Sequence, residues 1–175
     1  MATDQAALRD ALNSALELEH VGHDYYVKIA EKAESPLTKE VFTALAGQEL
    51  VHMERIQEIF NNLKFEGVDP HARADEMQKM VRGIFSRFSS HARSTWAMDN
   101  SEAYEYAQDL ERQSIAMYNK LAGESADPAE RQFFEELSRE ENLHLNALEN
   151  VYFFLQRTGD WFDHEESRVW NWMNT

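Results

Sequence analysis

Hydrophobic residues recur along this chain with the spacing of one face of an α-helix. Four long stretches show that period, at residues 4–33, 37–64, 101–124 and 128–157. Only six glycines and three prolines occur among the 175 residues, which indicates few turns and long elements. The pattern therefore predicts an all-α protein built from four long helices.

Proline follows a capping residue at the start of the second and fourth stretches. Ser35-Pro36 and Asp127-Pro128 each place an N-cap residue directly before a proline at the first helical position. Only a few residues join the first stretch to the second, and the third to the fourth. Short connections of this kind make neighbouring helices antiparallel, so the pattern predicts two helix hairpins.

A long connection separates the two hairpins, and an aromatic segment follows the second. We predict a single domain over residues 1–175, with hairpins at 4–64 and 101–157. Residues 65–100 would form a long crossover between the hairpins of a four-helix bundle. Residues 160–173 contain three tryptophans and predict a short C-terminal helix. This segment would fold over the bundle or pack against a second subunit, and on this basis we expect a homodimer.

Composition narrows the classes of partner. The net charge is −15, with 17 basic and 32 acidic residues, which argues against nucleic acid or an anionic membrane as the main partner. The absence of cysteine excludes disulfides and cysteine-ligated iron–sulfur centres from these residues. No apolar run approaches 18 residues, and the first residues do not resemble a signal peptide. We therefore expect a cytoplasmic protein.

The two hairpins repeat one arrangement of glutamate and histidine. Each carries a glutamate followed thirty residues later by a Glu-x-x-His motif, and an offset of 92 residues relates the two copies. The six residues are Glu19, Glu49, His52, Glu111, Glu141 and His144.

All six fall on the apolar faces of their helices at 100° per residue. A lone carboxylate in such a core costs several kcal/mol or becomes protonated, and four at one level repel one another. Two divalent cations that share bridging carboxylates would neutralise them. Imidazole combined with carboxylate suits iron, manganese or zinc. The alternative is a buried polar network without metal.

Two further histidines lie near the repeat. Glu17 and His20 form another Glu-x-x-His motif, but they face outward and their repeat partners are Asp109 and Arg112, so we exclude them as ligands. His23 lies on the inner face, one turn after Glu19. It is either an added ligand or proton donor, or a hydrogen-bonded core histidine.

The paired motifs resemble those of the ferritin-like superfamily, and most closely its rubrerythrin branch, over residues ~5–157. The resemblance implies a ferritin-like bundle that holds two iron ions, with manganese or zinc as possible metals. Glu49 and Glu141 would be the bridging ligands. Tyr26 and Tyr118, two turns after the first and third glutamates, resemble tyrosines that orient a carboxylate across the site or relay protons. The alternative is that both are ordinary aromatic residues of the core.

The chain departs from the usual rubrerythrin pattern at two points. Rubrerythrins usually carry a four-cysteine rubredoxin module that feeds electrons to the irons, and this sequence has no cysteine. We therefore expect either an external electron donor or slow turnover. Ser114 stands where many rubrerythrins have an extra glutamate. The ligand exchange that accompanies peroxide reduction in that family thus lacks its glutamate here.

Three functions remain open from the sequence. The resemblance implies a non-haem di-iron oxidoreductase that reduces hydrogen peroxide or dioxygen. A ferritin-like ferroxidase or iron-binding protein is the second, and it would be distinguished by a large shell with many irons per chain. The third is a non-catalytic helical bundle that binds no transition metal.

Overall fold

Four long helices make up the part of the chain that the structure describes. The computed structural model describes residues 2–62 and 101–156. The helices are α1 (Ala2–Lys32), α2 (Pro36–Asn62), α4 (Ser101–Glu124) and α5 (Pro128–Gln156). Each begins and ends within about two residues of its predicted bounds. The predicted crossover at 65–100 and the C-terminal helix at 160–173 lie outside the described residues.

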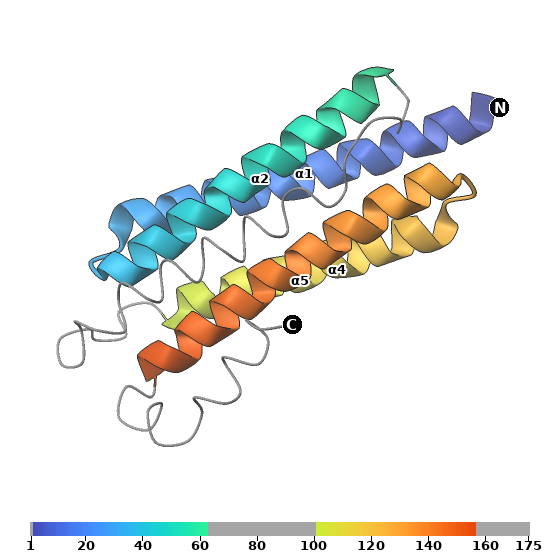
Figure 1. Ribbon diagram of the computed structural model, residues 1–175. Coiled ribbons are helices and arrows are strands. Elements are labelled where there is room, and N and C mark those ends of the chain that lie inside the picture. Colours follow the sequence, from blue (N-terminus) through green and yellow to red (C-terminus); the bar gives the residue numbers. More distant parts are fainter. Residues whose placement is uncertain (1, 63–100, 157–175) are drawn as a thin grey trace.

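The helices form two antiparallel hairpins that pack side by side (Figure 1). α1 packs along α2 and α4 along α5, while α1 also contacts α4 and α2 contacts α5. The turn between α1 and α2 lies at one end of the bundle, and the turn between α4 and α5 lies at the other. This arrangement confirms the predicted all-α, four-helix bundle. No described helix is long and apolar enough to cross a membrane.

Side-chain caps begin the second helix of each hairpin, as predicted. The Asp127 carboxylate accepts hydrogen bonds from the backbone amides of Ala129 at 2.7 Å and Glu130 at 3.3 Å. The Ser35 hydroxyl accepts one from the Thr38 amide at 3.3 Å. These side chains satisfy amides that have no partner within the helix, so they fix where α2 and α5 begin.

Asp127→Ala should lower the free energy of unfolding by about 1 kcal/mol, because two amides at the start of α5 lose their acceptor. Urea unfolding followed by circular dichroism would show a lower midpoint with an unchanged slope. Asp109→Ala is the matched control, since Asp109 is exposed in the middle of α4 and, among the described residues, forms an ion pair with the exposed Arg112. Equal losses for the two variants would contradict a capping role.

Two apolar clusters fill the bundle core, one on each side of a polar layer. The first includes Tyr26, Leu45, Ala107 and Ala147, with further residues toward the α1–α2 turn. The second includes Ala15, Ile56, Tyr118 and Leu137. On every helix the predicted ligands fall between the residues of the two clusters. The apolar clusters on both sides therefore enclose the glutamates and histidines and shield them from water.

Candidate metal centre

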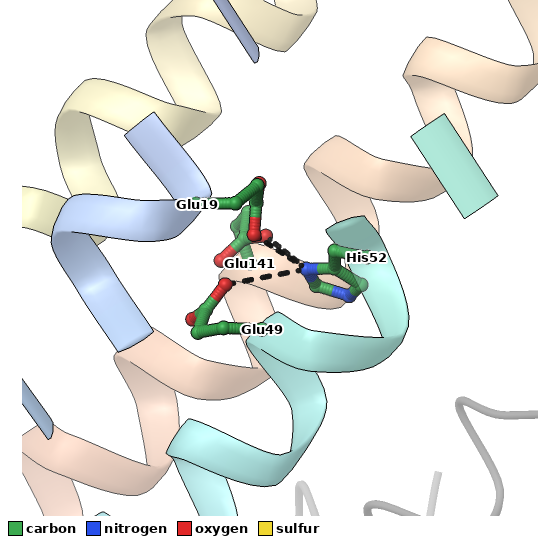
Figure 2. Close-up of side chains that lie close together, drawn as sticks. All are labelled: Glu19, Glu49, His52 and Glu141. Carbon is green, nitrogen blue, oxygen red and sulfur yellow. Dashed lines mark hydrogen bonds and ion pairs between the residues drawn. The ribbon is translucent and has the colours of Figure 1, made fainter. Parts of the chain in front are cut away.

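The structure brings the six predicted ligands together in one buried layer. Each of these residues is at most 3% exposed. They form two groups of four in which the possible ligand atoms all lie within 4.8 Å of one another. One group is Glu19, Glu49, His52 and Glu141 (Figure 2), and the other is Glu49, Glu111, Glu141 and His144. Glu49 and Glu141 belong to both groups, which is the arrangement that bridging ligands require.

Both histidines turn the same ring nitrogen, Nδ1, toward the carboxylates. His52 Nδ1 lies 2.9 Å from Glu141 Oε1 and 3.1 Å from Glu19 Oε2. His144 Nδ1 lies 3.1 Å from Glu141 Oε2 and 3.4 Å from Glu49 Oε1. The two rings stack with their centroids 5.3 Å apart. Each half of the layer therefore presents one imidazole nitrogen together with carboxylates from different helices.

The four carboxyl groups fall into two pairs, one with raised pKa values and one with lowered pKa values. Burial, followed by the charges of Glu49 or Glu141, raises the pKa values of Glu19 and Glu111 well above their ordinary value. Burial opposes ionisation of Glu49 as well, but hydrogen bonds from Glu19 and the histidines lower its pKa to about 2. Burial also opposes ionisation of Glu141, but the charges of His144 and His52 hold its pKa well below the usual range.

The histidines balance these carboxylates in the absence of a cation. Burial alone would lower the pKa values of His52 and His144, but Glu141 and the neighbouring glutamates raise them well above the ordinary value. The buried layer thus holds protons on groups that would have to lose them in order to bind metal.

The donor set fits a pair of divalent transition-metal ions. Carboxylates combined with imidazole suit iron, manganese or zinc, and the buried charge needs compensation. Among the described residues, buried Glu141 Oε1 accepts no hydrogen bond of good geometry, although His52 Nδ1 lies 2.9 Å away. A buried oxygen of this kind is costly unless something binds it, and a metal ion between the ligand groups would do so.

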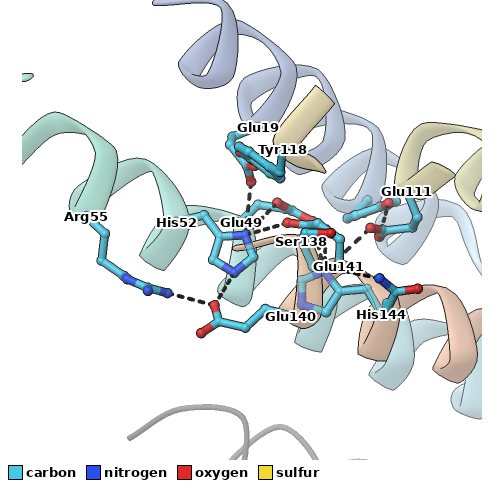
Figure 3. Close-up of polar contacts among 12 residues, drawn as sticks. Glu19, Glu49, His52, Arg55, Glu111, Tyr118, Ser138, Glu140, Glu141 and His144 are labelled. Carbon is cyan, nitrogen blue, oxygen red and sulfur yellow. Dashed lines mark hydrogen bonds and ion pairs between the residues drawn. The ribbon is translucent and has the colours of Figure 1, made fainter. Parts of the chain in front are cut away.

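Tyr26 and Tyr118 each bond a glutamate of the opposite hairpin. The Tyr26 hydroxyl donates to Glu111 Oε1 at 2.5 Å, and the Tyr118 hydroxyl donates to Glu19 Oε1 (Figure 3). Burial, followed by the charge of the bonded glutamate, raises both tyrosine pKa values well above 10.0. The phenols therefore keep their protons, and each acts as a donor that orients a carboxylate.

Tyr26→Phe should destabilise the protein by about 1–3 kcal/mol, because a buried Glu111 oxygen loses its donor. It should also weaken binding of the metal that Glu111 faces, which a cobalt(II) titration would measure. Tyr104→Phe is the matched control, since the buried Tyr104 hydroxyl bonds Thr38 Oγ1 at 3.1 Å and touches no ligand. Metal affinities that fall equally in both variants would contradict the positioning role.

The other sequence candidates lie outside the two groups. His23 is partly buried, and its Nδ1 lies 3.1 Å from the exposed carboxylate of Asp24. Glu17 and His20 are exposed, as their position on the outer face of α1 predicts. Ser114 is buried on α4, so the place of the additional glutamate holds only a hydroxyl.

Two buried residues next to the layer were not identified from the sequence. The Glu140 carboxylate lies 2.8 Å from His52 Nε2 and accepts a hydrogen bond from Arg55 Nη1 at 2.7 Å (Figure 3). The Arg55 guanidinium also stands over the Phe133 ring, 5.6 Å from its centroid. Burial opposes ionisation of Glu140, but the hydrogen bond and charge of His52 and the charge of Arg55 lower its pKa.

Comparison with known protein families tests the family membership that the fold and the ligands indicate. The model of the rubrerythrin family matches residues 10–152, which is most of the chain and includes all six ligands. The chain belongs to the rubrerythrin family. No curated protein and no solved structure matches it. Rubrerythrin membership confirms the resemblance seen in the sequence and supports a di-iron carboxylate protein, and the two buried groups of ligands fit such a centre.

Proposed function

We propose that this rubrerythrin-family protein is a non-haem di-iron oxidoreductase that reduces hydrogen peroxide or dioxygen. The observation that carries the proposal is the pair of overlapping ligand groups that share Glu49 and Glu141. Glu19 and His52 would hold one iron, Glu111 and His144 the other, and the shared glutamates would bridge them. Two ferrous ions would supply two electrons, which together with two protons convert one hydrogen peroxide molecule into two water molecules.

The surrounding residues support this reaction by position and by exclusion of water. Tyr26 and Tyr118 hold Glu111 and Glu19 through hydrogen bonds, so the carboxylates keep their orientation during turnover. The apolar clusters on both sides limit solvent around the reacting groups. The electrons that restore the ferrous state would come from a donor outside these 175 residues, since none of them is a cysteine.

Stopped-flow absorbance tests the proposal directly. Protein loaded anaerobically with two ferrous ions per chain should react with hydrogen peroxide much faster than free ferrous ion, consuming one peroxide per two irons. Glu49→Gln/Glu141→Gln should lose the fast phase, because the shared ligands are gone. A rate no greater than that of free ferrous ion would overturn the proposal.

Iron stoichiometry separates this activity from iron storage. A reductase should bind about two irons per chain and stop, however much ferrous ion is supplied with dioxygen. Uptake of many irons per chain into a large assembly, measured by elemental analysis and light scattering, would instead support the ferritin-like alternative.

A further inference from the structure

The two halves of the metal centre differ in what lies behind their histidines. On one side, His52 directs Nδ1 at the ligand layer and Nε2 at Glu140, 2.8 Å away. The positions related to Glu140 and Arg55 by the 92-residue offset are Gln48 and Ala147. Within the described helices, no carboxylate or other polar side chain contacts Nε2 of His144. The ligands repeat, but the support behind them does not.

Glu140 orients the His52 ring and favours the tautomer that a metal requires. A carboxylate can only accept, so Glu140 keeps a proton on Nε2, and the lone pair of Nδ1 would face the ligand layer once a metal replaces the proton there. Hydrogen bonding to a carboxylate also makes an imidazole a stronger donor to metal. Among the residues that the structure describes, His144 makes no such second bond, and the contacts of its ring are with the ligands themselves.

Arg55 holds Glu140 in place. Its guanidinium bonds the same carboxylate oxygen that faces His52, and both side chains are buried, with 9% and 7% of their surfaces exposed. The guanidinium is held in turn by the Phe133 ring. A buried carboxylate without such a cation would be costly, so the pair forms a fixed support for His52 and not a surface ion pair.

We propose that Glu140 and Arg55 are positioning residues that make the two metal positions unequal. The position at His52 binds a divalent transition metal first and more tightly than the position at His144. This inference rests on the metal centre of the proposed function. Partners of this kind behind a histidine ligand are typically worth about 10–100-fold in metal affinity, which sets the expected difference between the two positions.

Anaerobic titration with cobalt(II), followed by calorimetry and visible absorption, tests the inference. The unaltered protein should bind two cobalt ions in two resolved steps. Glu140→Ala should weaken the tighter step about 10–100-fold and bring it near the second. Glu140→Gln, which keeps an acceptor for Nε2, should recover part of that loss, and Arg55→Met should give an intermediate loss. Gln48→Ala, the matched change in the other half, should leave both steps unchanged.

Crystals with one cobalt per chain provide a second measurement that a general loss of stability would not alter. Anomalous scattering should lie at the His52 position in the unaltered protein and be divided between both positions in Glu140→Ala. Equal occupancy in the unaltered protein, or equal weakening of both steps by Glu140→Ala, would overturn the inference while leaving a two-metal centre intact. Failure of the unaltered protein to bind two metal ions would instead overturn the metal centre of the proposed function.

Discussion

Ferrous or manganous ions should raise the free energy of unfolding of the metal-free protein by about 5 kcal/mol when both positions are filled. A ligand at 100 times its dissociation constant contributes about 2.7 kcal/mol through mass action, and two independent positions roughly double that. The gain arises because the ligands are assembled only in the folded chain, where α1, α2, α4 and α5 bring them together. Thermal and urea unfolding, each measured with a chelator and then with metal, would give the difference.

Glu49→Gln/Glu141→Gln should remove most of the metal-dependent gain, because both ligand groups lose their shared members. The matched control is Glu17→Gln/His20→Ala, which destroys a Glu-x-x-His motif of the same spacing on the exposed face of α1. That control should keep the full gain. A metal-dependent gain that survives the loss of Glu49 and Glu141, or disappears in the control, would show that the stabilising metal binds elsewhere.

The metal-free protein should be most stable near pH 4.5 and should lose stability as the pH rises, more steeply above about 6.5. The raised pKa values of His52 and His144 contribute stability that is full below 6.5 and is lost as the pH rises through their folded values. The raised pKa values of Glu19 and Glu111 likewise contribute stability that is full below pH 4.5 and is lost as the pH rises through their folded values. The lowered pKa values of Glu49 and Glu141 contribute stability that is present above pH 4.5 and is lost as the pH falls through their folded values.

Urea unfolding with a chelator at pH 5.5 and pH 8 would measure this decline, since each unit of pKa shift corresponds to about 1.4 kcal/mol. Bound metal should reverse the trend, because metal competes with protons for the same atoms and binds better at higher pH. A metal-free protein that is equally stable at both pH values would contradict the protonation pattern of the layer. Glu17→Gln/His20→Ala serves again as the control and should show the same decline.

The helices and the ligand layer could be predicted because they depend on local spacing. Periodicity places Glu19, Glu49 and Glu111 on apolar faces, and the same argument excludes the exposed Glu17. Capping residues marked the starts of α2 and α5 for the same reason, since a cap acts within a few residues of itself. These features need no knowledge of how the helices meet.

The features that could not be predicted from the sequence depend on contacts between helices. Glu140 follows Arg139 and precedes Glu141, and nothing in its own helix indicates that Arg55 of α2 will cover it. The partner of each tyrosine was equally hidden, because Tyr26 shares a helix with Glu19 but bonds Glu111. His23 lies on the inner side of α1 by angle, yet its ring contacts Asp24. A helical wheel shows on which face of a helix a side chain lies, but it does not show which residue of another helix that side chain contacts.

The crossed tyrosine–glutamate bonds have the form of an interface between two identical subunits. Tyr26 of the first hairpin bonds Glu111 of the second, and Tyr118 of the second bonds Glu19 of the first. With the 92-residue offset, each bond is the image of the other. In a symmetric dimer, residue i of one subunit meets residue j of its neighbour and the reverse contact also exists. The bundle thus carries an approximate two-fold axis through the metal centre, and Glu140 with Arg55 is a buried place where the single chain departs from that symmetry.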